Sequence, residues 1–198
     1  MKFYNFSGGP SSLPELSLHA IYTHLLNYND TGLCILELNH RSDTFKELLS
    51  ETQNLVLELL NLTEDYIVIF LQGGASLQFT MLPMNYLKDG ERADYVLTDP
   101  WSEKAAECAK FFGVPNIAFS SKHTNFNRLP EQIELKFVPS SRYVHITTNN
   151  TLSGTQWSYV PETWVIPLVG DASSDIMSRE LDYSKFSLIY ASAQKNLE

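Results

Sequence analysis

Short apolar runs that alternate with helical patterns constrain the fold of this chain more than any other feature of its sequence. Such runs predict strands at 66–71, 93–98, 116–119, 142–148, 164–171 and 186–190. Between them, apolar residues recur at helical spacing over 16–25 and 45–60, and Ser102 is expected to cap a helix that runs to Phe112. Alternating strands and helices predict an α/β fold, with a mostly parallel sheet that helices cover on both faces.

Local signals mark where several of these elements begin and end. The segment 7–14 is rich in Gly, Pro and Ser, which predicts an extended arm before the first helix. Thr44 and Glu47 have the spacing of a capping box at the start of the long helix. Another helix is expected after Ser76, and Pro83 should kink or end it.

Charge and cysteine content narrow the choice of partners and compartment. The 198 residues carry a net charge of −9 without a Lys/Arg cluster, which argues against nucleic acid or an anionic membrane as a partner. The two cysteines, Cys34 and Cys108, form no disulfide framework. The first residues lack the apolar core of a signal peptide, and no apolar run approaches the length of a membrane span. We therefore expect a soluble cytoplasmic protein.

An acid and an amine follow two of the predicted strands. Asp171 ends the run 164–171, and Lys195 lies in the turn after the run 186–190. The carboxyl ends of parallel strands meet at the ligand crevice of an open sheet, so the two groups can lie together there. A lysine at the edge of a buried pocket can serve as an amine nucleophile. Each residue also has an ordinary interpretation, as a solvated turn lysine and a helix-capping aspartate.

Other strand ends carry residues suited to holding a ligand. The turn Gly73–Ser76 can offer backbone N–H groups and a hydroxyl to a phosphate at a helix N-terminus, or it can simply be a tight turn. Trp101 can cover an aromatic ligand or pack in the core. Asn150 and Thr151 can donate hydrogen bonds or form a polar turn. His19 and His24 are five residues apart and point to different helix faces, so no metal pair is expected.

The order of these features suits one cofactor. A phosphate turn, an aromatic plate, a hydroxyl, a carboxylate and a lysine fall at successive strand ends. Pyridoxal 5′-phosphate needs an anion cup and a stacking surface. It also needs an acid that keeps its ring nitrogen protonated and a lysine that binds its aldehyde.

At this point the sequence resembles the phosphoserine aminotransferase family, within class V of the fold-type-I pyridoxal-phosphate enzymes. The matching stretches run through nearly the whole chain in the family's order: 5–10, 40–42, 73–79, 83–85, 171–179 and 191–196. By this resemblance, the fold is that of the PLP-dependent transferase large domain. Many family members have Arg where this chain has Ser76.

The resemblance also implies a role for each site residue. Lys195 and Asp171 would be catalytic: Lys195 would hold the cofactor and carry the proton during transamination, and Asp171 would pair with the ring nitrogen. The cofactor-binding residues implied are Gly74, Ala75, Ser76, Trp101, Thr151, Asp171, Gln194 and Lys195. No metal is implied.

The reaction implied is amino transfer between O-phospho-L-serine and 2-oxoglutarate in serine biosynthesis. In a homodimer, His40 and Arg41 would reach the substrate phosphate in the neighbouring subunit's site, although they can equally be a surface pair before a helix. Another class V enzyme, such as a small-substrate transaminase or a cysteine desulfurase, and a non-catalytic self-associating fragment are the alternatives.

Family members continue well past Lys195, which shapes the expected domain organisation. We expect an N-terminal arm at 1–15 and a partial cofactor-binding large domain at 16–198, truncated on its C-terminal side, with the small C-terminal domain absent. A chain of this extent would be inactive, or nearly so, as a transaminase by itself.

Overall fold

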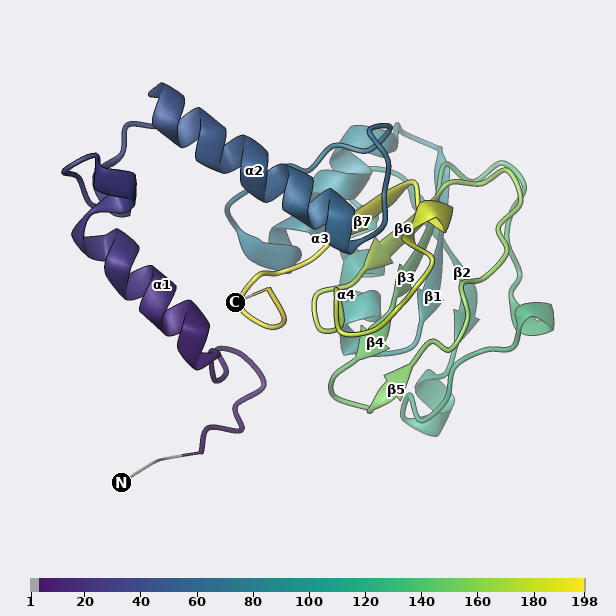
Figure 1. The fold of residues 1–198 in the computed structure, drawn as a ribbon. Coiled ribbons are helices and arrows are strands. Elements are labelled where there is room, and N and C mark those ends of the chain that lie inside the picture. The colour runs from purple at the N-terminus through teal and green to yellow at the C-terminus, as the bar shows by residue number, and fades with distance from the viewer. Residues whose placement is uncertain (1–3, 198) are drawn as a thin grey trace. The chain divides into compact units, whose positions relative to one another are not determined.

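The computed structural model describes residues 4–197 of the chain (Figure 1). The chain divides into two compact units, and the boundary between them falls between Phe70 and Leu71 in the sequence. Each unit is described by itself.

The first unit is helical. It contains α1 (Glu15–Leu26), the short 3-10 helices η1 (Tyr28–Asp30) and η2 (Ile35–Glu37), and α2 (Asp43–Leu59). The extended arm before α1 contains no helix or strand in its described part. Ser42 caps α2, because its hydroxyl accepts a hydrogen bond of 3.2 Å from the backbone N–H of Phe45. The capping box expected at Thr44 is therefore wrong by two residues, and Thr44 lies inside the helix.

The strand expected at 66–71 is not formed. This segment has no regular secondary structure and pairs with no strand among residues 4–197. Most of its apolar side chains are exposed, with Ile67 at 82%. An apolar β-forming segment becomes a strand only where a neighbour takes up its backbone hydrogen bonds.

The second unit contains a five-stranded sheet in the order β2-β1-β3-β6-β7 (Figure 1). The strands are β1 (Arg92–Leu97), β2 (Val114–Ser120), β3 (Val144–Thr147), β6 (Leu168–Asp171) and β7 (Leu188–Tyr190). Every neighbouring pair in this sheet is parallel, as the sequence predicts. A separate antiparallel pair, β4 (Asn149–Asn150) and β5 (Thr155–Gln156), follows β3 directly.

Two α-helices of this unit pack against the sheet. The first, α3 (Gly74–Tyr86), continues three residues past Pro83 rather than ending there. The second, α4 (Pro100–Ala109), begins earlier than expected because Asp99, not Ser102, is its N-cap. The Asp99 carboxylate accepts a hydrogen bond of 2.7 Å from the backbone N–H of Ser102, which occupies the third helical position.

The sheet has an apolar layer on each face. On one face, residues of β1 and β6 pack with α3 and α4 around Phe79, Leu82 and Ala106. On the other face, Trp157 and Phe186 pack on residues of β1, β3 and β6. This second layer also contains Leu135 and Phe186, which directly follow the short helices η4 (Gln132–Glu134) and η5 (Tyr183–Lys185). The sequence predicts helices on both faces of the sheet; within this unit, the α-helices α3 and α4 cover one face, and the segments around Trp157 and Phe186 cover the other.

Candidate active site

A pocket opens at the carboxyl ends of β1, β3 and β6. The chain goes from β1 to β2 on one side and then to β3 on the other, so the strand order reverses between β1 and β3. Ligands of open α/β sheets bind at such a point. The pocket is a half-open cavity of about 290 Å³. It is lined by Gly73, Gly74, Ala75, Ser76, Phe79, Trp101, Thr147, Asn149, Thr151, Asp171, Ser173, Ser174, Ser192, Gln194 and Lys195.

All eight residues that the sequence assigns to cofactor binding line this pocket. Several of its polar residues were not singled out: Thr147, Asn149, Ser173, Ser174 and Ser192. Three of these serines lie within the stretches 171–179 and 191–196 that carry the family resemblance. Their closeness in sequence to Asp171 and Lys195 is the signal that could have identified them as pocket residues.

The start of α3 forms one wall of the pocket. Gly73 has a φ of +100° and Gly74 a φ of +60°, which let the chain turn sharply into the helix. A Cβ on Gly74 would lie 3.0 Å from the Ser192 hydroxyl, so the segment after β7 approaches the turn closely. The N-cap of α3 is Gly73, and within residues 4–197 no side chain caps this helix. The N–H groups of its first turn and its dipole are therefore available to an anion.

Asp171 is a buried acid at the end of β6. Its side chain is 4% exposed, and its Oδ1 accepts a hydrogen bond of 3.0 Å from the backbone N–H of Ser173. Burial raises the pKa of this carboxyl, hydrogen bonds from Ser173 lower it, and the nearby Asp99 carboxylate raises it further. None of the ion pairs among residues 4–197 involves Asp171. A cation placed beside Asp171 would lower the free-energy cost of ionising this buried carboxyl.

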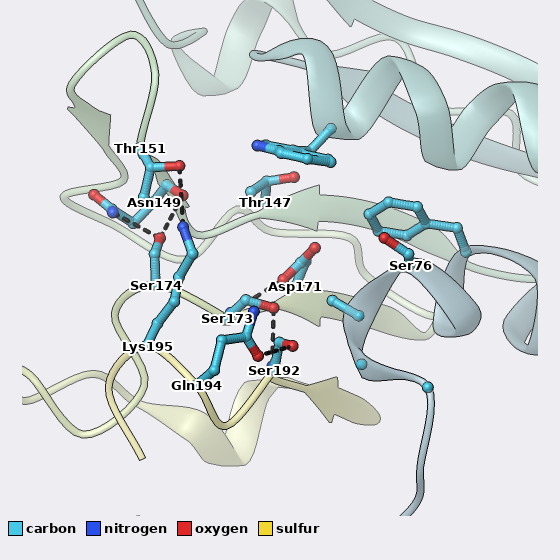
Figure 2. A pocket seen from close by; sticks show the side chains of 15 residues that line it. Ser76, Thr147, Asn149, Thr151, Asp171, Ser173, Ser174, Ser192, Gln194 and Lys195 are labelled. Atoms are coloured by element: carbon cyan, nitrogen blue, oxygen red, sulfur yellow. Dashed lines mark hydrogen bonds between the residues drawn. The ribbon is translucent and has the colours of Figure 1, made fainter. Parts of the chain in front are cut away.

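Lys195 brings an amine into the same pocket. Figure 2 shows its side chain directed toward Thr151, whose hydroxyl lies 3.5 Å from the Lys195 Nζ. Gln194 accepts a hydrogen bond from the Ser192 hydroxyl, and the backbone N–H of Ser192 donates to Ser173 at 3.1 Å. These bonds hold the turn that carries Lys195 beside the turn that follows Asp171.

Trp101 lies in the first turn of α4, next to the end of β1. It is 39% exposed and lines the pocket, so it is not the core residue of the alternative interpretation. The Lys104 ammonium lies 5.7 Å from the centre of its ring, a cation–π contact that favours one orientation of the indole. Asp99, buried immediately before this helix, fixes the turn from β1 into α4.

Asp175 organises the side of the pocket that carries Thr151. It is buried and accepts hydrogen bonds from the Thr148 hydroxyl and, at 3.1 Å, from the Gln156 amide. Arg179 pairs with it at 3.5 Å. Because Thr148 immediately precedes β4 and Gln156 is the last residue of β5, this one carboxylate fixes the base of the hairpin.

The remaining predicted site residues lie in the first unit. His40 and Arg41 are exposed and lie just before α2. Their role at a substrate phosphate stays a prediction. No helix within residues 4–197 is long and apolar enough to cross a membrane. In the same described range, no group of three or more His, Cys, Asp or Glu side chains can hold a metal ion.

The groups in the pocket fit a planar, phosphorylated cation that carries an aldehyde. Asp171 is a buried acid without an ion pair, and the Thr147 hydroxyl next to it in the sheet register is buried without a partner in the described part of the chain. The uncapped start of α3 suits a phosphate, Trp101 offers a flat face, and Lys195 supplies an amine. These are the functions that pyridoxal 5′-phosphate requires of its protein.

Comparison with known proteins assigns the family and the fold of this chain. Residues 3–197 match the family model of the class-V aminotransferases, so the chain belongs to that family. The fold is accordingly that of the PLP-dependent aminotransferases.

The particular relatives are phosphoserine aminotransferases. The enzyme of Lysinibacillus sphaericus is 50% identical over 194 residues, which make up 98% of this chain and 54% of that protein. A solved phosphoserine aminotransferase superposes with a TM-score of 0.96 at 48% identity, covering 99% of this chain and 55% of the other. The PLP-bound enzyme of Trichomonas vaginalis gives 0.90 at 29% identity, covering 100% and 55%. The chain thus spans about half the length of the relatives it matches.

Proposed function

We propose that this pocket binds pyridoxal 5′-phosphate, and that the whole protein transfers an amino group between O-phospho-L-serine and 2-oxoglutarate. The observation that carries the proposal is the buried Asp171 carboxylate. It lies without an ion pair, among the residues described, in the same pocket as the Lys195 amine and the uncapped start of α3. The identity to phosphoserine aminotransferases supports the choice of substrates.

Each residue would perform one physical task in this reaction. The N–H groups of Gly74, Ala75 and Ser76 would bind the phosphate, together with Gln194. Trp101 would cover the ring, and Asp171 would hold the proton on the ring nitrogen. The cofactor supplies an electron-withdrawing ring that stabilises negative charge on the substrate carbon. The Lys195 Nζ would take the proton from that carbon and return it to the former aldehyde carbon of the cofactor, on the other side of the nitrogen that joins the two carbons.

The assembly around this site is part of the proposal. The whole protein would be a cytoplasmic homodimer that uses small phosphorylated amino acids and 2-oxo acids, without nucleic-acid or membrane partners. Residues 1–15 would form the arm and 16–198 part of the large domain. His40 and Arg41 would contact the substrate phosphate in the other subunit. Replacing either by Ala should then raise KM for phosphoserine and leave cofactor affinity unchanged.

Cofactor binding is tested directly by covalent trapping. The chain is mixed with pyridoxal 5′-phosphate, reduced with borohydride and digested, and mass spectrometry locates the modified lysine. We expect the modification at Lys195, and its loss in Lys195→Ala. Lys185→Ala is the matched control, since Lys185 pairs with Glu162 at 3.1 Å outside the pocket. Modification at other lysines only, or equal labelling of the Lys195→Ala chain, would refute the assignment.

A further inference from the structure

Asp171 has a second layer of polar groups behind it. Asp171 and Tyr190 are register partners in the parallel pair β6–β7, so their side chains share one face of the sheet. This places the Tyr190 hydroxyl near the Asp171 carboxylate, where it lowers the pKa of that group, and the same hydroxyl lies 2.8 Å from Nε2 of His145 on β3. Three strands thus contribute one continuous row of polar atoms that ends in the pocket.

The row is enclosed by side chains. His145 is 1% exposed and Tyr190 is 8% exposed. The ring of Tyr190 packs edge-on against Phe79 with ring centres 6.3 Å apart. The ring of Tyr95 lies 5.2 Å from His145, tilted by 30°. Water therefore has little access to these atoms, and each proton in the row needs a protein acceptor.

The surroundings decide the charge of His145. Burial lowers its pKa to about 3, so the imidazole is neutral at ordinary pH. The titratable side chains that face this group are Tyr95 of β1, Tyr143 beside β3, Tyr190 of β7, Cys108 of α4 behind Tyr95, and Asp171 of β6. Burial raises the pKa of all three tyrosines, so they too stay neutral. Burial raises the pKa of Asp171 as well, and a hydrogen bond from Tyr190 opposes that rise by stabilising the ionised carboxylate.

The direction of the hydrogen bonds follows from counting protons. A neutral imidazole carries one N–H. His145 Nδ1 is buried without a partner in the described part of the chain. With the proton on Nδ1, that donor would be unpaired, and Tyr190 would have to donate to His145 instead of Asp171. With the proton on Nε2, both donors have acceptors, because Nε2–H donates to the Tyr190 oxygen and Tyr190 donates to Asp171.

We propose that His145 and Tyr190 are positioning residues that form a fixed relay, His145 Nε2–H to Tyr190 O–H to Asp171. The relay holds Asp171 as a carboxylate aimed into the pocket. Each donor strengthens the next, so the Tyr190 hydroxyl stabilises the charge of Asp171 more than an isolated phenol would. A carboxylate stabilised in this way leaves the shared proton on its partner. This inference rests on the proposed function, in which that partner is the cofactor's ring nitrogen.

The first test needs no cofactor. The chain is labelled with 15N-histidine, and the signal of His145 among the five histidines is identified by its loss in His145→Gln. We expect a neutral ring with the proton on Nε2 at neutral and mildly acidic pH. In Tyr190→Phe, the proton loses its acceptor and the Nε2 signal should shift. Tyr143→Phe is the matched control, because its hydroxyl pairs with Tyr95 at 2.6 Å and not with the relay. A proton on Nδ1 in the unaltered chain would overturn the proposal.

The second test follows the proton on the cofactor. With pyridoxal 5′-phosphate labelled with 15N in its ring, the unaltered chain should show a protonated ring nitrogen. Tyr190→Phe and His145→Leu should lose part of that signal and bind the cofactor about tenfold more weakly, the effect of one hydrogen bond to a charged group. His145→Gln keeps an N–H donor of similar reach and should restore both. An unchanged ring signal in Tyr190→Phe would overturn the relay. Failure of the unaltered chain to bind the cofactor would instead refute the proposed function, and the histidine measurement would still decide the relay.

Discussion

Replacing Gly73 by Ala tests how strictly the start of α3 depends on glycine. Gly73 has a φ of +100°, and a Cβ built on it would overlap the Leu77 side chain, lying 2.8 Å from the Leu77 Cβ. Truncating Leu77 to Ala cannot relieve this contact, because the Cβ itself is involved. The backbone at the turn must therefore move, and the N–H groups of the first helical turn move with it.

The size of the effect has two parts. A non-glycine residue in the left-handed region costs about 1–2 kcal/mol. Overpacking adds typically about 1–3 kcal/mol. Gly90 is a matched control: its φ is +79°, but a Cβ there has no heavy atom within 4 Å, so Gly90→Ala carries only the first cost. Both variants equally lose the flexibility of a glycine in the unfolded chain. We expect Gly73→Ala to be less stable than Gly90→Ala by about 1–3 kcal/mol.

Thermal and urea denaturation measure this difference. For a chain of this size, each kcal/mol lowers Tm by about 2–4 °C. Titration with pyridoxal 5′-phosphate, followed by absorbance, should show weaker binding for Gly73→Ala and unchanged binding for Gly90→Ala. If the two variants were equally stable and bound the cofactor equally well, the steric argument for Gly73 and the role of this turn as the phosphate cup would both be wrong.

Three further substitutions probe the site and the surface. Asp171→Asn should raise the Tm of the cofactor-free chain at neutral pH and lower its affinity for the cofactor. Burial raises the pKa of Asp171, so ionisation of this carboxyl lowers the stability of the folded chain as pH rises through that pKa. The amide of Asn stays neutral and avoids this loss. A lower Tm would contradict that reasoning. Trp101→Ala should weaken cofactor binding by about three- to tenfold, with Trp101→Phe closer to the unaltered chain, as fluorescence or absorbance titration can measure. Glu134→Gln should make the Tm of the chain less sensitive to acid. Arg128 lowers the pKa of Glu134 from 4.5 to about 2, so the stability that this pair contributes is lost as pH falls through that range. An equal loss of Tm on acidification in both chains would exclude this contribution.

The strands of the sheet were predictable because apolar runs and turn residues bound them closely. The run 93–98 corresponds to β1 at Arg92–Leu97, and the run 186–190 contains β7. The segment 66–71 has the same pattern but forms no strand in the described structure, because pairing depends on a neighbour that pattern alone cannot supply.

Helix starts were predicted less well because several capping residues stand close together. At α2, Ser42 precedes the helix and Thr44 lies in its first turn. At α4, Asp99 precedes the helix and Ser102 lies in its first turn. Each has a side-chain oxygen that can accept from a backbone N–H two or three residues on. The backbone decides between them: Asp99 has an extended conformation and caps, whereas Ser102 lies inside the helix. Sequence spacing does not contain that information.

The pocket was predictable as a set of strand ends, but its second layer was not. The rule that ligands bind at the carboxyl ends of parallel strands brings Asp171, Lys195 and Trp101 together from positions far apart in the sequence. His145 and Tyr190 lie inside apolar strands, where a polar residue ordinarily indicates nothing more than a satisfied core hydrogen bond. Only the register of β3, β6 and β7 places them behind Asp171.

The burial of Asp171 connects the stability of this unit to its proposed chemistry. A carboxylate at 4% exposure without an ion pair, among the residues described, is costly to a folded chain, and the nearby Asp99 increases that cost. A cationic ring nitrogen would remove much of it on binding, so the same low exposure that destabilises the empty pocket would strengthen the interaction with the cofactor. While the pocket is empty, the relay from His145 through Tyr190 limits the free-energy cost of the buried charge. It supplies a hydrogen bond to the Asp171 carboxylate without adding a cation that would compete with the ring nitrogen. An ionised lysine or arginine in the place of Tyr190 would stabilise Asp171 better and leave it less able to hold a proton on the ring.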